Sequence, residues 1–352
     1  MEQKVKIIKE QISDAIEQDK SLKIVGGNSK AFLGRNTAGT PIEMADFTGI
    51  ISYEPTELFI TARAGTLLSE VKQALAEHGQ ILPFEPAEVT EKTTIGGVVA
   101  SGLSGPRRSY AGSVRDFVLG IRCINGLGKD MSFGGQVIKN VSGYDLSRLM
   151  TGAFGTLGII IDISLKVLPI PEFELTAYQE MSTQKALEMM HKLSVKPIPL
   201  SATCYEGDLL LIRFSGNEKL VKETMRMFDL EEYANGDTFW NELRDYKSPI
   251  FNSGNTLWRL SVPSTSNIKL EGEQHLIDWG GAQYWLASER PAKDIFAMAK
   301  ELGGSALLFR GGDGDGDVFQ PLSDNILKIH QNLKHAFDPH RILNPGKMYE
   351  AI

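Results

Sequence analysis

Apolar residues recur at two spacings along this chain, and these spacings outline the expected elements. Residues 2–19 repeat isoleucine or valine every three or four positions, which predicts an amphipathic opening helix. A short apolar strand over 22–25 runs into a glycine-rich loop, and alternation over 58–64 predicts a further strand. The helical pattern that follows ends at Gly79, the residue type favoured in a left-handed C-cap.

The next apolar runs are strand-like and stop at two prolines. Runs at 117–124 and 131–133, separated by a turn, predict a β-hairpin. A β-branched strand over 159–168 ends at Pro169-Ile170-Pro171. Because proline interrupts strand pairing and stiffens a linker, we expect a domain boundary at this point.

Beyond the prolines, helix-like and strand-like segments alternate, which predicts an α+β domain with an antiparallel sheet. The expected helices are 183–193, 217–228 and 291–302, and the expected strands are 200–205, 208–214, 256–262, 282–287 and 305–309. A last amphipathic helix is expected over 322–336.

Composition narrows the class of protein. The 352 residues are 42% hydrophobic and 23% charged, as in an ordinary globular protein of two or three domains. A net charge of −7 argues against nucleic-acid binding. Without an apolar leader or an apolar run of ~18 residues, we expect no secretory signal, no direct membrane span and a cytoplasmic location. Two cysteines, Cys123 and Cys204, are too few to ligate an iron–sulfur cluster, and we expect buried thiols.

Glycine clusters between Pro83 and Val167 carry the first hint of chemistry. They fall in Thr94–Gly102, at Gly105 and Gly112, and in Gly152–Gly158 of a strand-rich segment. Backbone amides without side chains approach a flat or phosphorylated ligand closely. Their spread predicts a large, extended cofactor.

The loop Gly26-Gly27-Asn28-Ser29-Lys30 follows a strand and offers converging amides, a hydroxyl and a cation, so it is either a pyrophosphate nest or a turn between strands. The chain has no G-x-G-x-x-G and no Walker spacing, which argues against a Rossmann domain or a P-loop NTPase.

An ordered set of motifs resembles the FAD-binding half of the vanillyl-alcohol-oxidase, or PCMH-type, flavoproteins. The set comprises Gly26–Lys30, Pro55–Leu58, Pro83–Pro86, Thr94–Gly102, Gly105–Arg108, Gly112–Asp116, Lys139–Leu146, Gly155–Ile159 and the tail Asp338-Pro339 with Leu343-Asn344-Pro345-Gly346-Lys347. Within that superfamily, Asn28–Arg35, Gly105–Arg108 and Leu276–Gly281 are similar to the smaller FAD-binding subunits of bacterial glycolate oxidases.

The resemblance implies an α+β fold: a two-subdomain PCMH-type FAD-binding domain at 1–170, an α+β cap domain with an antiparallel sheet at 172–305, and a C-terminal segment at 306–352 that returns to the FAD domain. It also implies contacts to the pyrophosphate, flavin and adenine parts of FAD. The residues expected to bind FAD are Gly26, Gly27, Asn28, Ser29, Lys30, Thr94, Ile95, Gly96, Gly97, Ser101, Gly102, Gly155, Thr156, Gly158 and Ile159. Asn28 stands near the place of the histidine that tethers flavin in many relatives, so we predict non-covalent FAD.

The catalytic residues are less defined. Where related hydroxy-acid enzymes carry His-x-Gly-Asp-Gly-x-x-His, this chain reads Arg310 to Asp317, so both metal-binding histidines are replaced and no metal is expected. The same run lacks the glycine of a calcium loop at Val318. Candidates are Arg310, either a carboxylate ligand or a solvated or interfacial arginine; Asn344; and Lys347, beside the flavin N1–C2 carbonyl or simply exposed.

The resemblance implies a subunit of a glycolate or 2-hydroxy-acid oxidase that takes part in hydride transfer to flavin and passes electrons onward. It implies as partners a larger FAD-containing subunit with the hydroxy-acid site and an iron–sulfur subunit, which alone would hold the chain at the inner face of the membrane. Two alternatives remain: a non-catalytic assembly subunit with structural FAD, and an independent flavin oxidase with a changed substrate.

Overall fold

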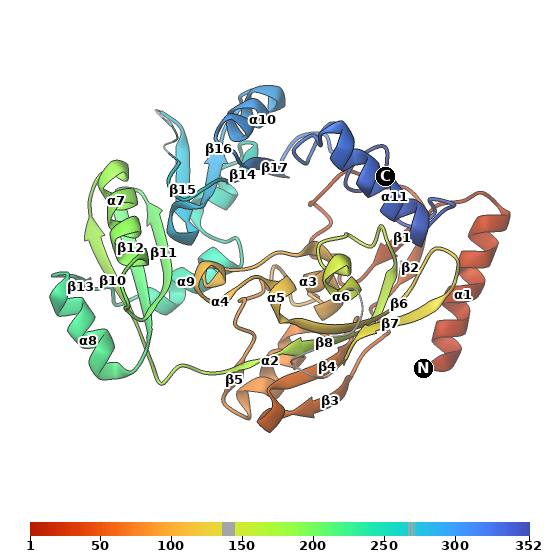
Figure 1. Ribbon diagram of the computed structural model, residues 1–352, viewed down its shortest axis with the longest axis horizontal. Coiled ribbons are helices and arrows are strands. Elements are labelled where there is room, and N and C mark those ends of the chain that lie inside the picture. The colour runs from red at the N-terminus through yellow and green to blue at the C-terminus, as the bar shows by residue number, and fades with distance from the viewer. Residues whose placement is uncertain (136–144, 267, 269, 271) are drawn as a thin grey trace.

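The computed structural model describes residues 1–135, 145–266, 268, 270 and 272–352. The motif at 139–146 therefore lies mostly outside the described residues. Figure 1 shows two lobes, one built from the first half of the chain and one from the middle, with the C-terminal helix lying beside the N-terminal elements.

The first lobe contains a five-stranded antiparallel sheet, in the order β3-β4-β8-β6-β7, and a separate parallel pair β1-β2. The strands are β1 Leu22–Val25, β2 Thr40–Glu43, β3 Ile50–Glu54, β4 Phe59–Arg63, β5 Gln80–Ile81, β6 Val118–Ile124, β7 Asp130–Gly134, β8 Ile159–Lys166 and β9 Leu168–Pro169. The helices are α1 Glu2–Glu17, α2 Leu68–Ala76, α3 Ile95–Ser101, α4 Arg108–Ala111, α5 Val114–Phe117 and α6 Leu146–Met150. A 3₁₀ turn, η1, spans Pro55–Glu57.

The local patterns account for most of this lobe. The predicted hairpin is confirmed, because β6 and β7 pair antiparallel. The apolar pattern gave no element for the segment that forms α3, where Thr94 Oγ1 accepts the backbone N–H of Gly97 and Gly102 closes the helix with φ +68°. A side-chain cap and a left-handed glycine decide a short helix that apolar alternation alone does not reveal.

The second lobe is an eight-stranded antiparallel sheet in the order β13-β10-β12-β11-β15-β16-β14-β17. Its strands are β10 Phe173–Glu180, β11 Leu200–Glu206, β12 Leu209–Gly216, β13 Glu231–Glu232, β14 Leu257–Ser261, β15 Gln274–Asp278, β16 Gln283–Ala287 and β17 Ser305–Arg310. Its helices are α7 Thr183–Ser194, α8 Glu218–Met227, α9 Gly236–Arg244 and α10 Ala292–Glu301, with 3₁₀ turns η2 Pro249–Asn252 and η3 Trp279–Gly281. The α+β class with antiparallel sheets is confirmed.

Two apolar cores belong to the second lobe. One lies between the sheet and the helices α7, α8 and α10 and includes Ala186, Val221 and Ile295. The other joins the opposite face of the sheet to the first lobe and includes Leu33, Leu103, Trp285 and Phe309. Because residues from both lobes share this second core, the cap sheet covers the first lobe.

The C-terminal segment returns to the first lobe, as Figure 1 shows for α11, Asp324–Phe337. Leu343 forms an isolated parallel bridge with Leu22, at the start of β1. The cap sheet itself extends through Arg310, past residue 305, because β17 pairs with β14.

Candidate functional site

A cavity of about 420 Å³ opens in the first lobe between β1, α3, the turn at 154–158 and the C-terminal tail. Most of the residues predicted to bind FAD line it. They are Gly26, Gly27, Asn28, Ser29, Lys30, Thr94, Gly96, Gly97, Ser101, Gly155 and Gly158. Two of the three catalytic candidates, Asn344 and Lys347, line it as well.

Four of the residues predicted to bind FAD are not among the residues that line the cavity. Ile95 and Ile159 are buried in the apolar core, and Gly102 caps α3. The carbonyl of Thr156 accepts a hydrogen bond from Lys334 Nζ at 2.8 Å. These residues hold the neighbouring lining residues in place.

The glycine-rich loop owes its path to close backbone packing. A Cβ built on Gly27 would lie 1.4 Å from the carbonyl oxygen of Lys92, so no other residue fits on this backbone. The loop therefore lies against the segment that leads into α3. Gly27 of the loop and Thr94 at the start of α3 both line the cavity.

Lys30 gives this end of the cavity its charge. Its ammonium is buried and has no hydrogen-bond partner among the described residues. Burial lowers the pKa of Lys30 to about 8, although the charge of Asp245 acts to raise it. A buried amine without a partner is costly unless an anion meets it, so the site fits a phosphorylated cofactor.

The tail forms the opposite wall. Asn344 Oδ1 accepts the backbone N–H of Ile24 at 2.9 Å, and Asn344 Nδ2 donates to the carbonyl of Phe154 at 2.7 Å. Gly155 has φ +71°, and a Cβ there would lie 2.9 Å from Asn344 Nδ2. Asn344 therefore ties β1 to the glycine turn, which is a positioning role.

Lys347 lies next to the glycine-rich loop. Its ammonium donates to the carbonyl of Arg35 at 3.1 Å, and the N–H of Arg35 donates to the Lys347 carbonyl at 2.9 Å. Burial, with a smaller contribution from the charge of Lys23, lowers the pKa of Lys347 to about 8. Lys23, Lys30 and Lys347 all line the cavity, whereas none of the described lining residues is Asp or Glu.

Arg310 lies outside the described lining of the cavity. Its Nη1 donates to the carbonyl of Phe251 at 2.8 Å, and its guanidinium lies 4.8 Å from the centre of the Phe32 ring. Of the alternatives left open, these contacts match an interfacial arginine. The acidic run beyond it folds on itself, since Asp313 Oδ1 accepts the N–H groups of Asp315 and Gly316.

Sequence reasoning missed several lining residues. They are Lys23, Ile24, Val25, Asn36, Thr37, Met44 and Ala64. Most are apolar or belong to strands and carry no local motif. Lys23, a charged residue inside the apolar run 22–25, was the one available signal. Elsewhere, among the residues that the structure describes, no helix is both long and apolar enough to cross a bilayer.

The profile of a family described as "FAD binding domain" matches residues 4–146. A D-lactate dehydrogenase of Archaeoglobus fulgidus is 30% identical over 82% of this chain and 76% of its own length. The glycolate oxidase subunit GlcD of Bacillus subtilis is 25% identical over 85% of this chain and 77% of its own length.

A solved alkyldihydroxyacetonephosphate synthase shares the fold, with a TM-score of 0.65 at 16% identity over 96% of this chain and 73% of that one. Together with the orphaned amine and the glycine loop, the domain match identifies FAD as the cofactor of this chain. The glycolate oxidase subunit GlcE of Escherichia coli is 47% identical over 97% of both chains, and the protein therefore belongs to the family of that subunit.

Proposed function

We propose that this chain is the FAD-binding subunit of a complex that oxidises glycolate or a related 2-hydroxy acid and passes the electrons to a partner subunit. The observation that carries the proposal is the cavity lined by Gly26–Lys30 and α3, in which the buried ammonium of Lys30 has no partner among the described residues. The likeness to a glycolate oxidase subunit supports the choice of substrate class.

Bound FAD would supply two-electron redox chemistry at its flavin ring. The residues of this chain would hold it without a covalent bond, since Asn28 occupies the predicted tether position. Backbone N–H groups of the glycine loop and the Lys30 ammonium would bind the phosphates, and α3 would line the rest of the cofactor. The cap sheet, through the core shared with the first lobe, would keep water from that side.

The cysteines bear on where an iron–sulfur cluster would be held. Cys123 and Cys204 are both buried. Burial raises the pKa of Cys123 to about 12 and also raises the pKa of Cys204. Two buried thiols do not provide the ligands of an iron–sulfur cluster, so the proposal assigns that cluster, and the intact hydroxy-acid site, to partner subunits.

The alternative, an assembly subunit whose FAD is structural, draws support from Arg310. The guanidinium of this candidate ligand for the substrate carboxylate donates a hydrogen bond to the Phe251 carbonyl and lies over the Phe32 ring. Under this alternative, turnover depends on the partner's flavin alone, and the FAD of this chain stabilises its fold without taking part in electron transfer.

Gly97→Leu separates the two functions. Gly97 lines the cavity within α3, and leucine suits a helix, so the variant should fold while its side chain fills the cofactor space. We expect the co-purified complex to assemble with this chain free of FAD and to lose glycolate-dependent dye reduction. Full turnover by that complex would instead establish the structural role. Gly316→Leu is the control, because its Cβ would meet open space.

A further inference from the structure

The lining of the cavity carries positive charge, although the chain as a whole is negatively charged. Lys23, Lys30 and Lys347 line it without a described Asp or Glu in the lining, in a chain whose net charge is −7. Lys30 belongs to the glycine loop, but Lys23 lies on β1 and Lys347 near the end of the chain. The N-terminal segment 23–30 and the C-terminal tail, which are distant in sequence, therefore bring lysine side chains to one cavity.

We propose that the C-terminal tail closes the cofactor site electrostatically: Lys347 and Lys23, together with Lys30, bind the diphosphate of FAD. This inference rests on the proposed function only in taking FAD as the ligand of this cavity. It assigns Lys347 to the phosphates, in place of the flavin N1–C2 carbonyl expected from the sequence.

The contacts of Lys347 favour the phosphates. Its backbone and ammonium pair with Arg35, and its Cε lies 3.1 Å from the Cβ position of Gly34. Residues 34–35 continue directly from the glycine loop, where the Leu33 N–H donates to the Lys30 carbonyl. Within the described part of the chain, the hydrogen bonds of Lys347 join it to Arg35 and Asn344, and none of them reaches α3, the expected flavin segment.

The protonation of the two buried amines supports an anionic ligand. Burial lowers the pKa of both Lys30 and Lys347 to about 8; Asp245 opposes the shift at Lys30, and Lys23 adds to it at Lys347. A diphosphate beside them would favour the charged form and raise both pKa values. Binding should therefore take up protons near pH 8, and affinity should fall as the pH rises from 7 to 9.

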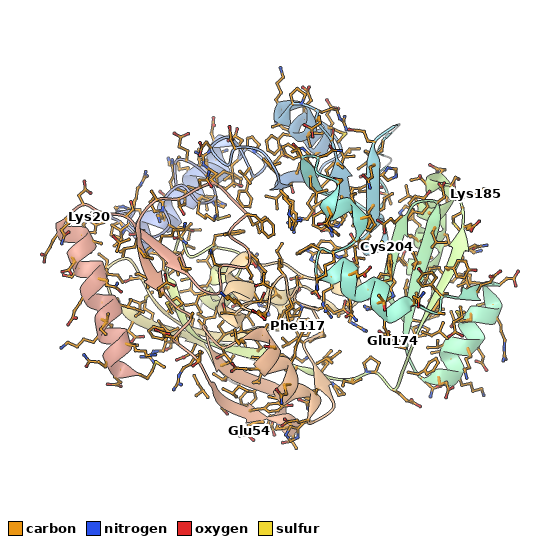
Figure 2. All side chains as sticks on the ribbon, turned by 180° about the vertical axis from the view of Figure 1, so that it is seen from behind. Lys20, Glu54, Phe117, Glu174, Lys185 and Cys204 are labelled. Atoms are coloured by element: carbon orange, nitrogen blue, oxygen red, sulfur yellow. The ribbon has the colours of Figure 1, made fainter. Side chains whose placement is uncertain are left out.

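The test uses the full-length chain freed of FAD, titrated calorimetrically with ADP, which has the diphosphate, and with riboflavin, which has only the flavin. In Lys347→Met we expect ADP affinity to fall about tenfold or more, the loss expected for one charge-assisted hydrogen bond, with riboflavin affinity unchanged. Lys347→Arg should recover most of the loss. Lys185→Met, on the outer end of α7 in Figure 2, is the control.

An unchanged ADP affinity in Lys347→Met, or an equal loss for ADP and riboflavin, overturns the inference. Should Lys347→Met fail to fold, Lys23→Met at the exposed rim of the cavity carries the same test. The wild type gives a further one: ADP affinity that stays constant between pH 7 and 9, without proton uptake, contradicts the role of the amines. A wild type that binds neither FAD nor ADP instead refutes the proposed function itself.

Discussion

Lys334 and Asp338 form an ion pair 2.8 Å long whose two side chains are completely buried. The Lys334 ammonium also donates to the carbonyls of Thr156 and Leu343, and Asp338 accepts the N–H groups of Ile342 and Leu343. One amine thus holds together the peptides next to Gly155 and Asn344, two residues that line the cofactor cavity.

Replacing Lys334 with methionine should destabilise the protein by about 3–5 kcal/mol, because Asp338 would remain buried without its counter-charge. The measurement is the free energy of unfolding from urea denaturation. Lys6→Met is a matched control, since Lys6 also pairs with an acid four residues on but is exposed, and we expect a change below about 0.5 kcal/mol. A loss no larger than the control's would show that the pair contributes nothing.

Asn344→Asp tests the tie between the tail and the glycine turn. Aspartate tolerates the φ of +40° at this position and can still accept the N–H of Ile24, but it cannot donate to the Phe154 carbonyl. We expect a loss of about 2 kcal/mol in stability and a clearly weaker affinity for FAD, measured by flavin fluorescence. Asn332→Asp, exposed on α11, controls for the added charge; equal FAD affinity in both variants would contradict the tie.

Local signals predicted the parts of this molecule in which one segment carries its own pattern. The helices α7, α8 and α10 and the strands β11, β12 and β14 lie within a few residues of their predicted ranges. The glycine loop at 26–30 was found because its residue types do not suit a strand or a helix. The structure adds the reason for Gly27, whose backbone lies too close to the Lys92 carbonyl for any side chain.

The rest depends on contacts distant in sequence. β10 and β15 were missed because polar residues dilute their alternation, and their neighbours in the sheet decide their conformation. Lys334 carries a side chain that a helix normally exposes to solvent, yet it is buried and donates to Thr156 of the first lobe. Lys23 was missed for a similar reason. The cavity beside β1 is completed by the C-terminal tail, and the sequence around Lys23 does not reveal that contact.

Glu85 links the lobes, and its removal should loosen the cap. Its carboxylate pairs with Arg213 of the cap at 2.9 Å and accepts the backbone N–H of Arg107 at 2.8 Å. Arg107 in turn pairs at 2.6 Å with Glu174, which lies near the start of β10 in the cap and is labelled in Figure 2. Glu85→Gln should cost roughly 3 kcal/mol of stability at neutral pH.

The pH dependence of this variant has a defined sign. Burial acts to raise the pKa of Glu85, but Arg213 and Arg107 outweigh burial and leave it below the usual value. The stabilisation is therefore present above the unfolded pKa and is lost as the pH falls through the lower folded pKa. The stability gap between wild type and Glu85→Gln should narrow in acid. Glu54 is exposed, so the control variant Glu54→Gln should match the wild type in stability at every pH.

Asp278 should behave in the opposite way. Burial raises its pKa to about 7, although Gln283, which donates at 2.9 Å, and the charges of Arg259 and Arg108 act to lower it. Between about pH 4 and 7 the unfolded chain has lost this proton and the folded chain retains it, so stability falls as the pH rises through that window. Asp278→Asn cannot ionise. Melting temperatures should show it similar to wild type near pH 4 and more stable at pH 8, by at most on the order of 4 kcal/mol. A constant difference across this range would mean that Asp278 ionises normally in the folded protein.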